Sequence, residues 1–98
     1  MITVRRTEEF AHWLSRLRDT NARARIILRI DRIISTGNLG DVKFVGQEIY
    51  EIRIKFGPGY RVYYKLYGDQ VILLLIGGDK SNQQRDIEYA LRLALEYE

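Results

Sequence analysis

Cationic side chains alternate along two neighbouring segments in the middle of the chain. Arg53 and Lys55 precede a Gly57-Pro58-Gly59 turn, and Arg61 and Lys65 follow it. Guanidinium and ammonium groups bind anions through charge-assisted hydrogen bonds. A row of this kind can hold an anion if the fold places the four side chains on one surface.

The two segments predict a β-hairpin, because apolar and polar residues alternate on both sides of the turn. A register in which Phe56 faces Tyr60 places apolar residues opposite one another on one face. On the other face it pairs Lys55 with Arg61, Arg53 with Tyr63, and Glu51 with Lys65. Like charges directly opposite one another are destabilising. Either an anion binds between Lys55 and Arg61, or both side chains extend into water from an exposed sheet face.

The composition restricts the kinds of site that the chain can carry. Its 98 residues suit a single domain, residues 1–98. There is no cysteine, which excludes disulfides and thiolate metal sites, and the lone His12 has no second ligand at metal-binding spacing. We therefore expect His12 at the surface or the edge of the core, and neither a metal nor a cofactor. Sixteen basic residues against thirteen acidic ones leave a net charge of only +3, so any nucleic-acid role depends on where the charge lies.

No segment has the length of a membrane span. The longest apolar run, Val71 to Ile76, is six residues, and the N-terminus lacks the apolar core of a signal peptide. These features predict a cytoplasmic protein that makes no membrane contact.

The N-terminal part of the chain predicts a short strand and two helices. Residues 2–5 are β-branched and basic, and Thr7 is a suitable N-cap for a helix over residues 8–18. A second helix carries an isoleucine stripe and ends at Gly37, which suits a C-cap. The opposite face of this helix bears Arg25, Arg29 and Arg32, which either contact solvent or bind RNA or a partner.

The C-terminal part predicts more strands and a last helix. Residues 42–45 suit a short strand, and residues 70–76 are apolar on both faces, as in a central strand. Gly77 and Gly78 are expected to end that strand, and a final helix begins near residue 81. The predicted class is α+β, with an N-terminal αα-hairpin, three to four central antiparallel strands, a short N-terminal strand and a C-terminal helix. If all helices cover one face, Arg53, Lys55, Arg61 and Lys65 form a basic floor on the other.

Several motifs together resemble a known family. They are Gly37-Asn38 with Gly40-Asp41 and Lys43, then Tyr50-Glu51-Ile52-Arg53-Ile54, then Gly57-Pro58-Gly59-Tyr60-Arg61-Val62-Tyr63-Tyr64, and finally Gly77-Gly78-Asp79-Lys80-Ser81 with Gln83 and Asp86-Ile87. The chain resembles the RelE/ParE toxin superfamily over nearly its whole length, and within it the HigB-like, phage Gp49-like addiction module killer branch. The resemblance implies the RelE-like fold.

The resemblance also implies a toxin of a type II toxin-antitoxin system. Relatives of the RelE and HigB kind cut messenger RNA on the ribosome without a metal, by attack of a 2′-hydroxyl on the neighbouring phosphate, and so inhibit translation. Two alternatives stay open on the same fold. One is a ParE-like DNA gyrase poison, and the other is a weakly toxic or degenerate member that acts mainly as an antitoxin-binding module.

The family pattern carries over to particular residues. Arg61 matches an arginine that contacts the cleaved phosphate, Arg53 and Lys55 match basic residues of the preceding strand, and Lys80 matches one after the last strand. Many RNA-cutting relatives also place a tyrosine or histidine late in the chain as acid or base, where this chain has only Tyr89 and Tyr97. The candidate catalytic set is therefore Arg53, Lys55, Arg61, Lys80, Tyr63 and Tyr89, and the candidate RNA-binding set is Arg53, Lys55, Arg61, Lys65, Arg25 and Arg29.

The same resemblance implies two partners. One is messenger RNA on the ribosome. The other is a cognate antitoxin with a helix-turn-helix DNA-binding domain, which would assemble with this chain into a hetero-oligomer.

Overall fold

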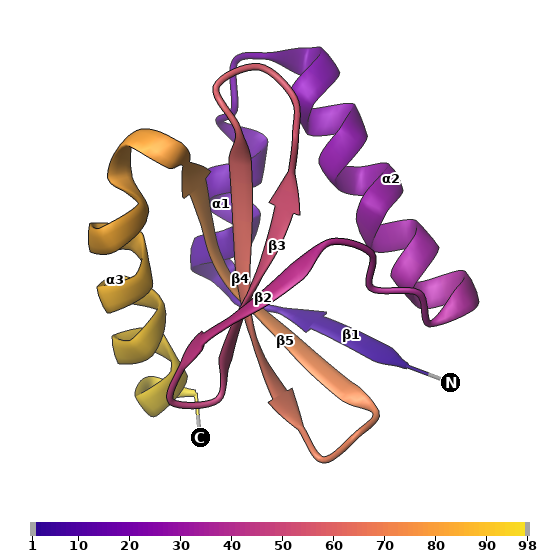
Figure 1. The fold of residues 1–98 in the computed structure, drawn as a ribbon, viewed down its shortest axis with the longest axis vertical. Helices are drawn as coiled ribbons and strands as arrows, with labels where there is room; N and C mark the ends of the chain where they lie inside the picture. The colour runs from indigo at the N-terminus through magenta and orange to yellow at the C-terminus, as the bar shows by residue number, and fades with distance from the viewer. Residues whose placement is uncertain (1, 98) are drawn as a thin grey trace.

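A five-stranded sheet runs through the centre of the computed structural model, which describes residues 2–97 (Figure 1). Its strands are β1 (Thr3–Arg6), β2 (Val42–Gly46), β3 (Ile49–Ile54), β4 (Tyr60–Tyr67) and β5 (Val71–Asp79), in the spatial order β1-β5-β4-β3-β2. The short β1 runs parallel to β5, and the other neighbours are antiparallel. The predicted α+β class is confirmed, and the sheet has four antiparallel strands, the upper end of the predicted three to four, plus the short N-terminal strand.

Three α-helices surround the sheet: α1 (Glu8–Ser15), α2 (Thr20–Thr36) and α3 (Gln83–Glu96), the last preceded by the 3-10 turn η1 (Lys80–Asn82). The Thr7 hydroxyl accepts a hydrogen bond from the Phe10 N–H at 2.9 Å and donates one to the Leu75 carbonyl at 2.7 Å. This cap therefore also ties α1 to β5. Gly37 ends α2 with a φ of 74°, as predicted. The first helix ends three residues earlier than expected, and none of the helices within residues 2–97 is long and apolar enough to cross a bilayer.

The helices lie on both faces of the sheet, so the prediction that all of them cover one face is wrong. Gly77 faces Trp13 of α1, whereas its neighbour Gly78 faces Asp86 of α3. Because successive strand residues point to opposite faces, α1 and α3 lie on opposite sides of β5. The hydrophobic core is divided in the same way into two clusters. The first includes Phe10, Ile26, Ile52, Val62 and Leu74, and the second includes Ile49, Tyr63, Leu75, Ala90 and Leu93.

Gly77 and Gly78 lie inside β5 and do not end it, contrary to the prediction. A Cβ atom on Gly77 would lie 2.2 to 2.5 Å from ring carbons of Trp13, and one on Gly78 would lie 2.9 Å from the carboxyl carbon of Asp86. The glycine pair is therefore needed for close packing of a helix on each face of one strand, and not for a turn.

The β3–β4 register differs by two residues from the predicted one. Arg53 faces Arg61, Glu51 faces Tyr63, and Ile49 faces Lys65. The strands are joined by a five-residue loop, residues 55–59, and not by a three-residue turn, so Lys55 lies outside the ladder. A shift of two residues leaves the paired side chains of β3 and β4 on their predicted faces, because side chains alternate with a period of two.

Replacing Gly77 by alanine should destabilise the protein, because the new methyl group would overlap the Trp13 ring. Overpacking of this kind costs about 1–3 kcal/mol of unfolding free energy. Chemical denaturation of Gly77→Ala in the wild-type and Trp13→Leu backgrounds measures the coupling. The cost should be smaller in the Trp13→Leu background, and an equal cost in both would contradict the packing account.

Candidate active site

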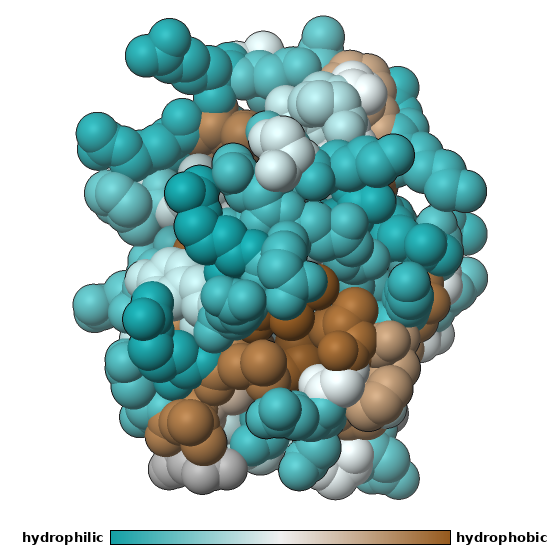
Figure 2. All heavy atoms as spheres, turned by 60° about the vertical axis from the view of Figure 1, so that its left-hand side comes forward, coloured by the Kyte–Doolittle hydropathy of each residue, from teal (hydrophilic) through white to brown (hydrophobic). Residues whose placement is uncertain are grey.

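Four predicted cations meet at one end of the sheet. Arg53, Lys55, Arg61 and Lys80 all line a groove of about 380 Å³ beside the β3–β4 loop. The loop stands at the top of Figure 1, next to the turn that leads into α3. Figure 2 brings the left-hand side of Figure 1 forward. Hydrophilic side chains cover most of the upper part of that side, and hydrophobic ones gather lower down. We call these four residues the cation cluster.

Gly59 allows two members of the cation cluster to converge. Its φ is +86°, and an added Cβ atom would lie 3.4 Å from Arg61 Nη1 and 3.9 Å from Lys80 Cβ. Its carbonyl accepts hydrogen bonds from the Lys80 N–H at 2.9 Å and from Arg61 Nη1 at 3.4 Å. Glycine at this position thus joins the β3–β4 loop to η1 and brings the two cationic residues close together.

Arg61 forms an ion pair with a buried carboxylate. Glu51 is fully buried, and its Oε2 lies 3.5 Å from Arg61 Nε and accepts a 2.8 Å hydrogen bond from Gln83 Nε2. The side chain of Arg61 is only 14% exposed. A buried charge needs a charged or hydrogen-bonding partner, so Glu51 holds β3, β4 and the start of α3 together at the groove.

Arg53 and Lys55 share a second carboxylate. Arg53 Nη2 donates to Asp41 Oδ1 at 3.0 Å, and Lys55 Nζ lies 3.8 Å from Asp41 Oδ2. Arg53 and Arg61 face one another across the ladder. Each arginine of this like-charged pair has its own carboxylate, Asp41 for Arg53 and Glu51 for Arg61. Among the residues that the structure describes, four cations and no acidic residue line the groove itself, which suits the binding of a phosphate.

Tyr63 lies beneath the site and not on its surface. It is fully buried among residues that pack against α3, so it cannot stack on an RNA base. Burial, and then the neighbouring Glu51, raise the pKa of its hydroxyl. The phenol therefore remains protonated at neutral pH.

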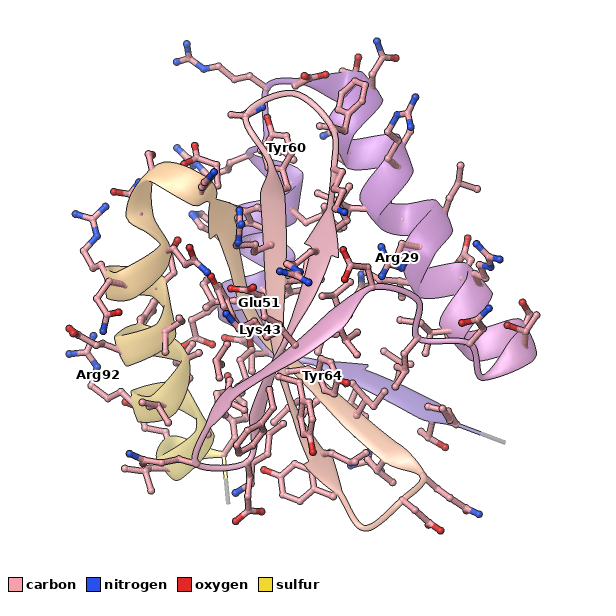
Figure 3. All side chains as sticks on the ribbon, viewed as in Figure 1. Arg29, Lys43, Glu51, Tyr60, Tyr64 and Arg92 are labelled. Atoms are coloured by element: carbon pink, nitrogen blue, oxygen red, sulfur yellow. The ribbon has the colours of Figure 1, made fainter. Side chains whose placement is uncertain are left out.

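Three predicted RNA-binding residues do not line the groove of the cation cluster, although Arg25 and Arg29 line a neighbouring groove together with Lys55. Lys65 is buried on the α3 face, so the continuous basic floor does not exist. The Arg29 guanidinium donates to the carbonyls of Leu39, Asp41 and Arg53 at 2.9 to 3.2 Å, which orders the chain before β2. Figure 3 shows Arg29 on the side of α2 that faces the sheet. Burial lowers the pKa of Arg29. Arg25 lies over the Phe56 ring at 4.3 Å.

The late tyrosines also lie elsewhere. Tyr89 lines a separate groove with Trp13 and His12, and Arg92 lies 5.2 Å from its ring centroid. Tyr97 donates to Glu9 at 2.8 Å. His12 is exposed, as predicted. No group of three or more potential metal ligands occurs among residues 2–97.

A family model and a relative identify the chain. Residues 12–95 match the family described as "Phage derived protein Gp49-like". A Haemophilus influenzae protein, described as uncharacterized, is 46% identical over 95 residues, which cover 97% of this chain and 95% of the relative. The chain belongs to the Gp49-like family.

Solved structures show that this Gp49-like protein has the fold of RelE proteins. A variant of the Escherichia coli toxin RelE in its free state matches with a TM-score of 0.71 and 16% identity, over 93% of this chain and 95% of that one. The Methanococcus jannaschii RelB-RelE antitoxin-toxin complex matches with a TM-score of 0.67 and 21% identity, over 84% and 96%. The predicted RelE-like fold is thereby confirmed.

Three residues of the candidate site were not predicted from the sequence: Glu51, Asp41 and Gln83. Glu51 was paired with Lys65 in the predicted register, although its position on the same strand face as Arg53 was visible in the alternation. Asp41 and Gln83 reach the site from outside the hairpin, at separations of 12 and 32 residues from their partners. The hairpin pattern alone contained no signal for these contacts.

The Asp41 carboxyl should titrate below the usual aspartate pKa of about 3.9. The hydrogen bond from Arg53 lowers this pKa most, and the charges of Arg53, Lys55 and Arg29 add to the effect. Because the folded-state value is depressed, the pair stabilises the fold above the unfolded-state pKa, and this contribution is lost as the pH falls through the folded-state value.

A carboxyl-detected NMR titration measures the pKa of Asp41 in the wild type, in Arg53→Gln and in Arg92→Gln. Only Arg53→Gln should raise the pKa. An ordinary value in the wild type, or the same value in Arg53→Gln, would show that Arg53 does not hold this carboxylate in solution.

Proposed function

We propose that this protein is the toxin of a type II toxin-antitoxin pair, and that it cuts messenger RNA on the ribosome and thereby inhibits translation in the cytoplasm. The observation that carries the proposal is the cation cluster, in which Arg61 is backed by the buried Glu51. The likeness to RelE structures, including the toxin of a RelB-RelE complex, supports the toxin class.

The proposed reaction is an internal transesterification that needs no metal. The 2′-oxygen of one nucleotide forms a bond to the adjacent phosphorus, and the bond from phosphorus to the 5′-oxygen of the next nucleotide breaks. The products are a 2′,3′-cyclic phosphate and a free 5′-hydroxyl. One proton leaves the 2′-hydroxyl, and one reaches the departing oxygen. Negative charge grows on the phosphoryl oxygens as the new bond forms, so fixed cations stabilise the transition state more than the bound substrate.

The groove suggests separate roles for its cations. Arg61, held by Glu51, and Lys80, joined to it through Gly59, face the phosphoryl oxygens and stabilise their charge. Arg53 positions the phosphate from the neighbouring strand. Arginine does not lose its proton in proteins, so of the two β3-side cations only Lys55, whose side chain is 86% exposed, can exchange protons with the 2′-hydroxyl or with water.

The proposal includes an antitoxin partner that carries a helix-turn-helix domain. The solved RelB-RelE structures, in which an antitoxin and a toxin form a complex, support an antitoxin partner, and the helix-turn-helix domain is part of the proposal alone. Co-expression with the product of the neighbouring gene, followed by purification through a tag on this chain, should recover both proteins as one complex. Failure to copurify, and continued growth arrest on co-expression, would contradict this pairing.

Removing the central charge should abolish toxicity. Arg61→Ala alone would leave Glu51 buried without its partner, which costs about 3–5 kcal/mol of stability and confuses the result. The paired variant Glu51→Gln with Arg61→Met removes both charges together. Loss of one electrostatic donor slows such reactions by about 10²–10³-fold. We therefore expect cells that express the paired variant at wild-type level to keep growing.

Two further variants control this experiment. Lys80→Gln tests an exposed member of the cation cluster with no buried partner and should also restore growth. Arg92→Gln removes the same charge from the outer face of α3, where Figure 3 shows it directed away from the sheet, and should stay toxic. Growth arrest by a folded paired variant, checked by circular dichroism, would contradict the assignment of Arg61.

A map of cellular messages after induction tests the type of target. Primer extension should find new 5′ ends within translated frames in the wild type and none in the paired variant. Intact messages together with cleaved, gyrase-bound DNA would instead support a gyrase poison.

A further inference from the structure

A second groove adjoins the cation cluster. It lies between β2 and the start of α3, has a volume of about 810 Å³, and is lined by Lys43, Gly46, Lys80, Ser81, Gln84 and Ile87 among others. Lys80 also lines the groove of the cation cluster, so the two hollows meet at this residue. Lys80 thus borders both hollows, and a strand that binds one phosphate at Arg61 and follows Lys80 would reach the groove beside β2.

The charge of this second groove suits a nucleic-acid strand. Lys43 and Lys80 are the charged residues among those that line it, and both are exposed. Lys43 faces Glu51 in the β2–β3 register, and Figure 3 labels both near the centre of the sheet. Among residues 2–97, however, Glu51 pairs with Arg61 and Gln83, and Lys43 makes no ion pair within 4.0 Å. Its ammonium group is therefore available to a ligand.

Neutral groups occupy the space between the two lysines. Gln83 is held in place by its donation to Glu51, which uses one of its two amide N–H donors and leaves its amide oxygen able to accept. Gln84 lies in the first turn of α3, and in the described part of the chain its side chain makes only an exposed 3.3 Å hydrogen bond to Glu88. Val45 and Ile87 add apolar surface. Amides beside apolar surface can bind the edge and the face of an unstacked base, which is how proteins read single-stranded RNA.

We propose that the groove between β2 and α3 is a second RNA subsite, which holds the nucleotide next to the cleaved phosphodiester. Lys43 binds the phosphate of that nucleotide, and Gln83 and Gln84 contact its base and so influence where the RNA is cut. This inference rests on the proposed function, because the cation cluster supplies the phosphate position from which the strand continues. Glu51 contacts both Arg61 and Gln83 and so fixes the positions of these two side chains relative to one another. The two subsites can therefore bind neighbouring parts of one strand.

Binding of a short RNA tests the subsite directly. The probe is a fluorescent trinucleotide of adenosine, 2′-O-methylated so that it cannot be cut, and its affinity is measured by anisotropy over a range of salt concentrations. Lys43→Gln should weaken binding by about tenfold, the effect of losing one hydrogen bond to a charged group. It should also reduce the slope of log K against log salt by about 0.7, the value for one phosphate contact on a single strand.

Arg92→Gln is the matched control, because it changes the net charge equally on the outer face of α3. It should leave affinity and salt slope at the wild-type values. Gln84→Ala should change the relative affinities for trinucleotides of adenosine and uridine, without changing the salt slope. Equal binding by Lys43→Gln and Arg92→Gln would overturn the subsite.

A second measurement separates failure of the subsite from failure of the proposed function. If the wild type cuts messages and the positions cut are the same in Lys43→Gln, Gln84→Ala and Arg92→Gln, the subsite is wrong and the ribonuclease proposal stands. If the wild type neither binds the trinucleotide nor cuts messages, both are wrong. Binding of a glutamate-rich peptide at Lys43, in place of the trinucleotide, would assign the groove to an acidic protein segment and also overturn the subsite.

Discussion

The buried carboxylate of Glu51 is the interaction on which the site depends. It is fully removed from water, and its attraction to Arg61 and the hydrogen bond from Gln83 offset the cost of that burial. These two partners come from β4 and from the first turn of α3. A single carboxylate on β3 therefore links the groove cation to the start of the last helix.

The position of α3 depends in turn on a strand without side chains at two positions. Gly77 and Gly78 allow Trp13 on one face and Asp86 on the other to approach the β5 backbone. Any larger residue would push one helix away from the sheet. Because Gly78 faces Arg61 in the register, the close approach of α3 occurs beside the cation cluster. The packing of α3 on β5, which completes the second hydrophobic cluster, thus also places α3 along one side of the candidate site.

Mutual repulsion among the cations is limited by the two carboxylates. Arg53 faces Arg61 across the ladder, an arrangement that is unfavourable in isolation. Asp41 holds one arginine and Glu51 the other, so the guanidinium groups stay oriented in the free protein. A site arranged before its ligand arrives loses less conformational entropy on binding, which suits the proposed role in holding an RNA phosphate. The remaining positive charge is carried by the exposed Lys55 and Lys80.

Local patterns in the sequence were sufficient to predict the helices, the hairpin, the α+β class and the candidate cations, because periodicity, caps and turn residues act over a few positions. They also placed the paired residues of β3 and β4 on their correct sheet faces, although the β3–β4 register was wrong by two residues. The sequence alone did not show that α3 crosses to the opposite face, that Lys65 and Tyr63 are buried there, or that Tyr89 points toward α1. Nor did it connect Asp41 to Arg53 or Gln83 to Glu51. These outcomes follow from long-range packing and from the pairing of charges that are distant along the chain, and only the folded arrangement decides them.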